Sequence, residues 1–333
     1  MSTIKYSQLH SDACKLLEAA GMPAEESSET ATCIIASDAW GIGSHGLMRL
    51  PFYLERLSAG GINATAKLKE VTNLPSLRIF DGNGGMGHWQ LKKAAEIATN
   101  LADTQGIAAV GIGRSNHCGA LGIYVWPMLE RNLVGIIFST GPAVMPPWGG
   151  KSSMLSTSPL AAGIPTNPAT VIDLATSAVA RGKIAAKAQK NEELEPGWAF
   201  DENGNPTTDP KLALKGMLAP LGGVKGYALA VLVESLTGAL IGPKLAADIP
   251  DMFDNKQANL NQDISHFVIA IKAEALTIDG SNRLAEFSER IESSGGRLPG
   301  SKRSNPFNIS EDLEINIADS VHAELEGWKS KLL

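Results

Sequence analysis

Apolar residues recur at helical spacing near the start of the chain. One helix face is formed by Leu9, Ala13, Leu16, Leu17 and Ala20. Gly21 ends this pattern, and Pro23 opens a second one that carries Glu25 and Glu26 in its first turn and runs to about residue 38. The N-terminal part is therefore predicted to form two helices.

The middle of the chain changes to short, β-branched apolar runs. These lie at 77–80, 107–112 and 133–140, with Gly, Pro and Asn turns between them. Helical patterns separate some of the runs, which predicts a mixed α/β organisation around a sheet. The stretch 196–210 is rich in turn residues and long for a loop in a compact domain, so we expect it to serve function.

The longest apolar segment is 227–242. It is short for a membrane span and carries Glu234 near its middle. We therefore predict a buried helix there.

Composition narrows the class of protein. The 333 residues are 44% hydrophobic and 19% charged, which is typical of a soluble globular protein, and no run of Lys and Arg suggests binding to a membrane surface. A net charge of −6 excludes the basic footprint of a nucleic-acid binder, so a small-molecule partner is expected. Cys14, Cys33 and Cys118 show no CxxC spacing, and the first residues lack a signal-peptide pattern. These features predict a cytoplasmic protein.

A glycine motif follows the first strand of the middle region. Gly82, Gly84 and Gly87 match GxGxxG between a predicted strand and a predicted helix, as in dinucleotide-binding folds. The acid expected further on would be Asp103, but it falls at the end of the helix and not after the next strand. A glycine turn leading into a packed helix explains the pattern better.

Three other chemistries find no support in the sequence. The six histidines show neither HExxH nor another ligand spacing, so no metal site is predicted. A GxSxG elbow and a phosphate-binding P-loop are also missing.

The stretch GIGSHGLMRLPFYLERL at 41–57 carries the main candidate chemistry. If a helix begins near Ser44, then His45, Arg49 and Tyr53 share one of its faces. Histidine can exchange a proton with a substrate oxygen near neutral pH, and arginine can hold a carboxylate through two hydrogen bonds. The pair suits 2-oxo acid chemistry. A helix cap followed by a surface histidine and an exposed arginine fits the same residues.

This stretch and most of the chain resemble the malate/L-lactate dehydrogenase family of the second type, which is unrelated to the Rossmann-fold lactate and malate dehydrogenases. The other matching segments follow in family order at 113–124, 141–150, 173–184, 206–214, 221–243 and 297–303. Members reduce 2-oxo acids or related imino acids with NADH or NADPH. They include malate, lactate, sulfolactate, ureidoglycolate and diketogulonate dehydrogenases and piperideine-2-carboxylate reductases.

The resemblance implies a fold and an assembly. The fold is α/β but not Rossmann, with a largely antiparallel central sheet and a helical region built from both termini. We expect residues 1–75 and about 275–333 to form a helical, dimerisation and substrate region, and residues 76–274 to form a central domain that binds NAD or NADP. The resemblance also implies a homodimer with shared active sites.

The resemblance assigns roles to individual residues. Ser44 would orient His45, His45 would donate the proton to the 2-oxo group, and Arg49 would bind the substrate carboxylate. Further substrate contacts are expected from Thr157, Arg181 and Lys183. The residues expected to contact the cofactor are His117, Cys118, Gly119, Ala120, Leu121, Asp173, Leu174, Ala175, Lys225, Gly226, Arg297, Lys302 and Arg303. Gly119 and Gly226 would let backbone N–H groups approach the pyrophosphate, while the basic residues would supply charge.

Two positions depart from the family pattern. Members that reduce imino acids carry an Asp where this chain has Lys183, which favours a 2-oxo acid over a cyclic 2-imino acid. Gly43 replaces the usual acid before Ser44, so a hydrogen bond made by that acid is lost. The alternatives are a reductase of a cyclic 2-imino acid, a ureidoglycolate or sulfolactate dehydrogenase, and a binding protein that keeps the fold without turnover.

Overall fold

The computed structural model describes residues 1–251 and 253–333. Its helices are α1 (Tyr6–Ala19), α2 (Ala24–Ala39), α3 (Leu50–Ala59), α4 (Gly87–Gln105), α5 (Trp126–Leu129), α6 (Arg181–Lys190), α7 (Pro210–Lys215), α8 (Val224–Glu234), α9 (Ala273–Leu276), α10 (Gly280–Ser293) and α11 (Asp319–Leu332). Its strands are β1 (Ser2–Lys5), β2 (Lys69–Leu74), β3 (Leu77–Asp81), β4 (Ile107–Ser115), β5 (Leu133–Ser139), β6 (Leu160–Ile164), β7 (Thr170–Leu174), β8 (Ala199–Phe200), β9 (Pro206–Thr207), β10 (Met217–Leu218), β11 (Ile264–Lys272) and β12 (Glu314–Ile317).

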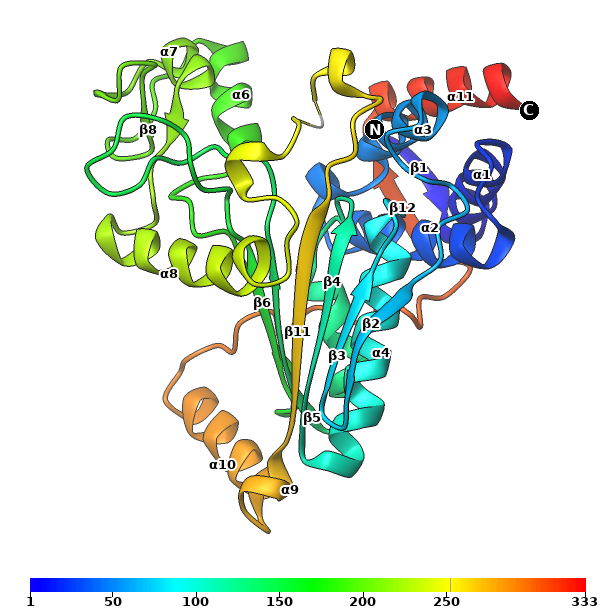
Figure 1. The fold of residues 1–333 in the computed structure, drawn as a ribbon, viewed down its shortest axis with the longest axis vertical. Helices are drawn as coiled ribbons and strands as arrows, with labels where there is room; N and C mark the ends of the chain where they lie inside the picture. The colour runs from blue at the N-terminus through cyan, green and yellow to red at the C-terminus, as the bar shows by residue number, and fades with distance from the viewer. Residues whose placement is uncertain (252) are drawn as a thin grey trace.

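Both ends of the chain meet in one helical region. Leu9, Ala13, Leu16 and Leu17 of α1 are buried, as their spacing predicts, and α2 begins directly after Pro23. Strand β1 pairs antiparallel with β12, which brings α11 beside α1 and α3 (Figure 1). The expected helical region from both termini is confirmed.

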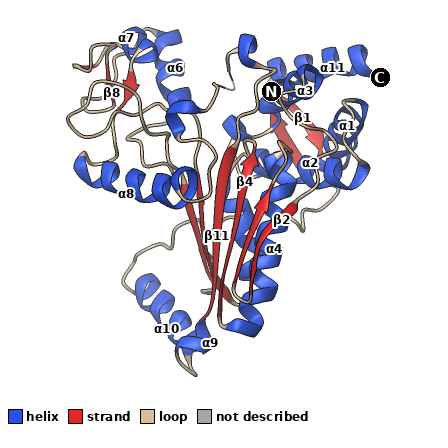
Figure 2. Cartoon of the chain, in the orientation of Figure 1, coloured by secondary structure: helices blue, strands red, loops and turns tan. Residues whose placement is uncertain are grey.

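A seven-stranded sheet forms the centre, in the order β2-β3-β4-β11-β5-β6-β7. All neighbours in this sheet are antiparallel except β3 and β4, which confirms the largely antiparallel sheet. Strand β11 lies between β4 and β5, far from both in sequence, as the long central strand in Figure 2 shows. Helix α4 packs on β4 and β11 and closes the main apolar core.

In the glycine turn between β3 and α4, the space beside the glycines is occupied by Asn116 of the same chain. The side-chain amide of Asn116 donates to the carbonyls of Gly84 (2.8 Å) and Gly85 (3.0 Å). A Cβ on Gly87 would fall 2.0 Å from the Asn116 carbonyl oxygen. These glycines therefore allow close packing of the chain against itself, which supports the structural interpretation of the GxGxxG match.

A second lobe contains α6, α7, α8 and the small sheet β10-β8-β9, around its own apolar cluster (Figure 1). The turn-rich stretch at 196–210 forms the short β8–β9 pair of this lobe. The prediction of a buried helix at 227–242 is wrong in part. Helix α8 forms and Glu234 is buried, but Leu229, Leu232 and Leu240 are exposed. Because α8 is apolar on all sides, packing within one chain covers only part of it.

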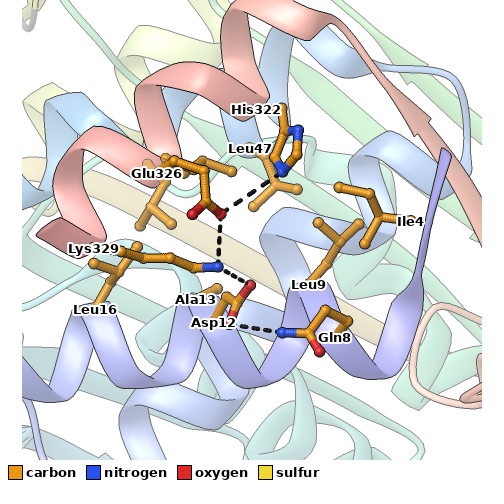
Figure 3. Close-up of a pocket in the computed structure, with 12 residues that line it drawn as sticks. Ile4, Gln8, Leu9, Asp12, Ala13, Leu16, Leu47, His322, Glu326 and Lys329 are labelled. Carbon is orange, nitrogen blue, oxygen red and sulfur yellow. Dashed lines mark hydrogen bonds and ion pairs between the residues drawn. The ribbon is translucent and has the colours of Figure 1, made fainter. Parts of the chain in front are cut away.

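A cavity of about 310 Å³ lies between α1, α11 and the start of α3 (Figure 3). Its apolar walls include Leu9, Ala13, Leu47 and Leu50. The charged groups beside the cavity form ion pairs with each other. Lys329 of α11 pairs with Asp12 of α1 and with Glu326, the latter at 2.8 Å. Within the described ranges, no helix combines the length and apolar character needed to cross a membrane.

Candidate active site

Two 3₁₀ turns carry the Ser-His pair and the candidate carboxylate ligand. They are Gly43–His45 and Leu47–Arg49, and α3 begins only at Leu50, so the predicted helix from Ser44 is wrong. Asp38, near the end of α2, is the reason that 3₁₀ turns form here in place of a helix. Its carboxylate accepts the N–H of Leu47 at 2.7 Å, and a Cβ on Gly46 would lie 2.2 Å from that same carboxylate. The chain therefore bends around Asp38 before α3 starts.

Asp38 was missed by sequence reasoning. Its carboxylate oxygen lies 3.4 Å from where a Cβ on Gly43 would stand, so an acid from α2 occupies the space beside the residue that departs from the family pattern. Burial raises the pKa of Asp38 to about 6, although the hydrogen bond from Leu47 opposes this. An acid close before a glycine-rich turn was the only signal in the sequence.

His45 is oriented by its neighbour in the chain. Its Nδ1 lies 2.9 Å from the Ser44 hydroxyl oxygen, which leaves Nε2 for other partners. Burial, followed by repulsion from the Arg49 guanidinium, lowers the pKa of His45 to about 4. The imidazole is therefore neutral at pH 7, with one ring nitrogen free to accept a hydrogen bond.

Arg49 is held in place from two sides. Its Nε donates to the Ser44 carbonyl at 2.6 Å, and its guanidinium carbon lies 4.6 Å from the centre of the Phe253 ring. Among the described residues, no hydrogen bond from protein reaches the two terminal nitrogens. This edge of the guanidinium can accept a carboxylate through two parallel hydrogen bonds.

A second histidine lies beside His45. The His117 ring is stacked near the His45 ring, with centres 6.0 Å apart. Nδ1 of His117 accepts the Gly119 N–H at 3.3 Å, so the Tyr53 hydroxyl, 2.6 Å from the same nitrogen, must donate to it. The neutral imidazole of His117 then carries its proton on Nε2. Tyr53 thus faces the site as its spacing predicts, but through His117.

His88 and His266 complete a buried histidine cluster that sequence reasoning did not foresee. Tyr53 touches the His88 ring edge-on, with centres 5.0 Å apart, and no described group hydrogen-bonds either ring nitrogen of His88. Burial lowers the pKa of His88 to about 3 and of His266 to about 4. These histidines show no regular spacing in the sequence, because they come together only in the folded chain. The described residues include no group of three or more potential metal ligands placed to hold an ion.

Part of the predicted cofactor set comes together around Asp173 at the end of β7. Its carboxylate accepts the Gly122 N–H at 3.0 Å and lies 3.8 Å from Arg303. Burial raises the pKa of Asp173, against the hydrogen bond from Gly122 and the charge of Arg303. Nη1 of Arg303 is buried without a hydrogen-bond partner among the described residues. This orphaned donor, beside the 117–121 segment, fits an anionic or hydrogen-bonding group of a nicotinamide cofactor.

A second group of the predicted cofactor and substrate residues lies just after β7, around Thr176. Thr176 follows Ala175 in the chain, and its N–H donates to the Thr157 carbonyl at 2.9 Å. The Thr176 carbonyl in turn accepts the N–H of Leu221 at 2.8 Å, and Leu221 lies shortly before Lys225 in the chain. Thr157, the residues after β7 and the start of α8 therefore adjoin. The N–H of Gly226 donates to Leu221 at 2.8 Å, and a Cβ there would meet the Leu221 carbonyl at 2.3 Å. Gly226 thus has a packing role, and its N–H is already engaged.

Four of the predicted residues make no hydrogen bond or ion pair with these groups among the described residues. Arg181 donates to the Leu214 carbonyl at 3.0 Å, and the Lys183 ammonium lies 4.7 Å from the centre of the Trp198 ring, so both belong to the α6–α8 lobe. Arg297 and Lys302 are exposed on the loop that pairs with β7 through Pro299 and Val171.

Comparison with known proteins gives a consistent set of matches over nearly the whole chain. The sequence profile of the malate/L-lactate dehydrogenase family matches residues 4–326. The chain is 36% identical over 317 residues to (2R)-3-sulfolactate dehydrogenase (NADP(+)) of Chromohalobacter salexigens, covering 94% of this chain and 93% of the relative. The sulfolactate dehydrogenase structure from Methanocaldococcus jannaschii superposes with a TM-score of 0.89 at 29% identity, covering 99% and 97%. The Δ1-piperideine-2-carboxylate reductase structure from Pseudomonas syringae pv. tomato gives 0.89 at 27% identity, covering 98% and 100%.

Proposed function

Because the chain belongs to the malate/L-lactate dehydrogenase family and is an NAD(P)-dependent oxidoreductase, we propose that it interconverts a small 2-oxo acid and the corresponding 2-hydroxy acid. The observation that carries this proposal is the Arg49 guanidinium, fixed by Ser44 and Phe253 with its outer edge open, next to a neutral His45. A carboxylate on that edge places the adjacent substrate oxygen near a group that can exchange its proton.

Ser44 and His45 would act as a unit. For Nε2 of neutral His45 to accept a proton from a 2-hydroxy acid, Nδ1 must carry the ring hydrogen, and the Ser44 oxygen 2.9 Å away then accepts it. The same hydrogen bond persists in the imidazolium that returns the proton to a 2-oxo acid. Ser44 therefore stabilises the productive tautomer in both directions. The nicotinamide, when bound, supplies or accepts the hydride.

Chain segments around Asp173 and the start of α8 would bind the cofactor. Arg303 offers Nη1, which lies 3.8 Å from Asp173 but makes no hydrogen bond to the described residues, Lys225 is exposed beside the glycine-rich start of α8, and His117 offers Nε2–H. Gly222 and Gly223 before α8 both have positive φ, which gives an open helix start of the kind that binds phosphate groups. These contacts do not distinguish NAD from NADP.

A cyclic 2-imino acid is the second candidate substrate. It is supported by the similarity in fold to the piperideine-2-carboxylate reductase. Lys183 opposes it, because it offers an ammonium beside Trp198 where that branch of the family carries an acid. Of the two candidate substrate classes, we therefore favour the 2-oxo acid.

We also propose that the protein is a homodimer whose active sites draw on both subunits. Within one chain Arg181 and Lys183 contact Leu214 and Trp198 of the α6–α8 lobe, and among the described residues neither bonds to the Ser44 turn. Helix α8 and the residues after it leave large apolar side chains exposed, which a second subunit would cover.

The function is tested by mixing the protein with NADH or NADPH and a panel of 2-oxo acids and cyclic 2-imino acids, while following the nicotinamide absorbance. We expect turnover of at least one 2-oxo acid. His45→Ala should lower that turnover by about 10²- to 10⁴-fold and leave cofactor binding intact. Turnover of imino acids alone would reverse the order of the two candidates. Cofactor binding without turnover of any compound would favour a binding protein, and a fully active His45→Ala would remove His45 from the mechanism.

A further inference from the structure

The segment at 253–260 is docked on α3, the helix that follows Arg49. Arg56 of α3 donates to the carbonyls of Gln257, at 3.2 Å, and Leu260. A Cβ on Gly61 would lie 2.0 Å from the Ala258 carbonyl oxygen, so these two segments of the chain are in close contact there. We call residues 253–260 the covering segment.

Arg56 is unusual because it is buried without a carboxylate partner among the described residues. Only 2% of Arg56 is exposed, and main-chain carbonyls of the covering segment meet its charge. An arginine buried in this way is costly unless its donors are satisfied, and here both terminal nitrogens donate to carbonyls while Nε has no hydrogen-bond partner among the described residues. The side chain therefore ties the position of the covering segment to α3.

The first residue of the covering segment reaches Arg49. The Phe253 ring lies over the Arg49 guanidinium, 4.6 Å from its carbon, and meets the Phe52 ring edge-on at 5.4 Å between centres. Phe253 itself is 45% exposed, so its ring also forms part of the surface beside Arg49. The guanidinium is thus fixed on its face by Phe253 and at Nε by Ser44.

We propose that Phe253 is a positioning residue that sets carboxylate selectivity, an inference that rests on the proposed function of Arg49. Its ring holds the guanidinium plane so that the two terminal nitrogens meet a substrate carboxylate edge-on. The ring also keeps water away from one side of that ion pair, which strengthens it. Arg56 maintains the arrangement by holding the covering segment on α3.

Kinetics of Phe253 variants test the role. Phe253→Ala should raise KM for the preferred 2-oxo acid about 3- to 10-fold, the effect of one cation–π contact, and leave kcat nearly unchanged. Phe253→Tyr keeps the ring and should retain the wild-type KM. Phe287→Ala removes an exposed phenylalanine from α10 and serves as the control. Equal KM values in Phe253→Ala and wild type, or a loss in kcat alone, would overturn the proposal.

A second measurement needs no substrate and so separates this inference from the proposed function. With 4-fluorophenylalanine placed at 253, the ¹⁹F resonance should shift when Arg49 is replaced by Ala, because the cation leaves the ring face. Arg56→Met should shift it as well and speed amide hydrogen exchange at 257–260. An unmoved resonance in Arg49→Ala would show that the ring does not stack on Arg49 in solution, whatever the enzyme turns over.

Discussion

At His45, burial and a neighbouring cation act on the same proton. The Arg49 guanidinium disfavours the imidazolium, and burial disfavours it more strongly, which together lower the pKa of His45 to about 4. A substrate carboxylate on Arg49 would cancel the repulsion, so we expect substrate binding and proton uptake by His45 to be coupled. In the proposed function, Arg49 would therefore both bind the acid and adjust the proton affinity of His45.

This coupling predicts the direction of a pKa change. Arg49→Gln removes the positive charge, so the pKa of His45 should rise toward the ordinary value of about 6.5, although burial keeps it below. Histidine NMR signals followed as a function of pH measure this directly, with Arg290→Gln on α10 as an exposed-arginine control. A His45 pKa that stays the same in Arg49→Gln would mean that the two side chains do not interact.

Arg49→Lys should be far from conservative. Lysine offers a point charge on a flexible stem in place of a planar fork, so we expect a loss of about 1.5 to 3 kcal/mol in kcat/KM, mainly as weaker substrate binding. Comparing a 2-oxo acid with its amide isolates the ion pair: wild type should prefer the acid strongly, and Arg49→Ala should lose most of that preference. If both discriminate equally, Arg181 or Lys183 holds the carboxylate instead.

Among the elements, α1 and α11 pack loosely where they meet the start of α3. The cavity there is lined by Leu47, which Figure 3 labels, and by Leu50, and these two residues flank Arg49 in the chain, so the packing of the two helices supports the turn that carries Arg49. The bond from Lys329 to Asp12 joins the two helices across it. The position of the turn thus depends on helices from both ends of the chain.

Filling this cavity should stabilise the protein. Ala13→Leu adds apolar volume where space exists, and we expect a gain of about 0.5 to 2 kcal/mol in the free energy of unfolding. Ala31→Leu on α2 is the matched control, because Ala31 is fully buried and does not line the cavity, so overpacking should cost about 1 to 3 kcal/mol. Urea denaturation measures both variants. Equal destabilisation by the two would show that the cavity is not open to a larger side chain.

For the whole molecule, the exposed apolar surface of α8 predicts self-association. Leu232, Leu229 and Val231 are each at least 39% exposed on this helix, and Leu240 beyond it is 76% exposed. We expect a dimer, or a multiple of one, at micromolar concentration, and Leu232→Glu should shift the mass toward the monomer because it would bury a charge. Sedimentation measures the mass, with Leu333→Glu at the C-terminus as the control. A fully active monomer in the wild-type protein would refute shared active sites.

The sequence by itself determined the periodic elements and the chemistry of the main candidates. The helical spacing of Leu9 to Leu17 and the β-branched runs at 77–80 and 107–112 give α1, β3 and β4, because side-chain periodicity follows directly from local backbone geometry. The choice of Ser44, His45 and Arg49 likewise came from the sequence and its family resemblance. Their assigned roles stay predictions until they are measured.

Only the tertiary structure decided how distant residues meet. Asp38 replaces the expected helix at Ser44 with two 3₁₀ turns, since its carboxylate takes the Leu47 N–H from outside the segment. Tyr53 sets the tautomer of His117, and Phe253 covers Arg49, across separations of 64 and about 200 residues for which sequence spacing carries no information. The exposure of α8 could not be predicted from the sequence for a related reason. Apolar character predicts burial, but whether the covering surface belongs to the same chain depends on the packing of the whole molecule.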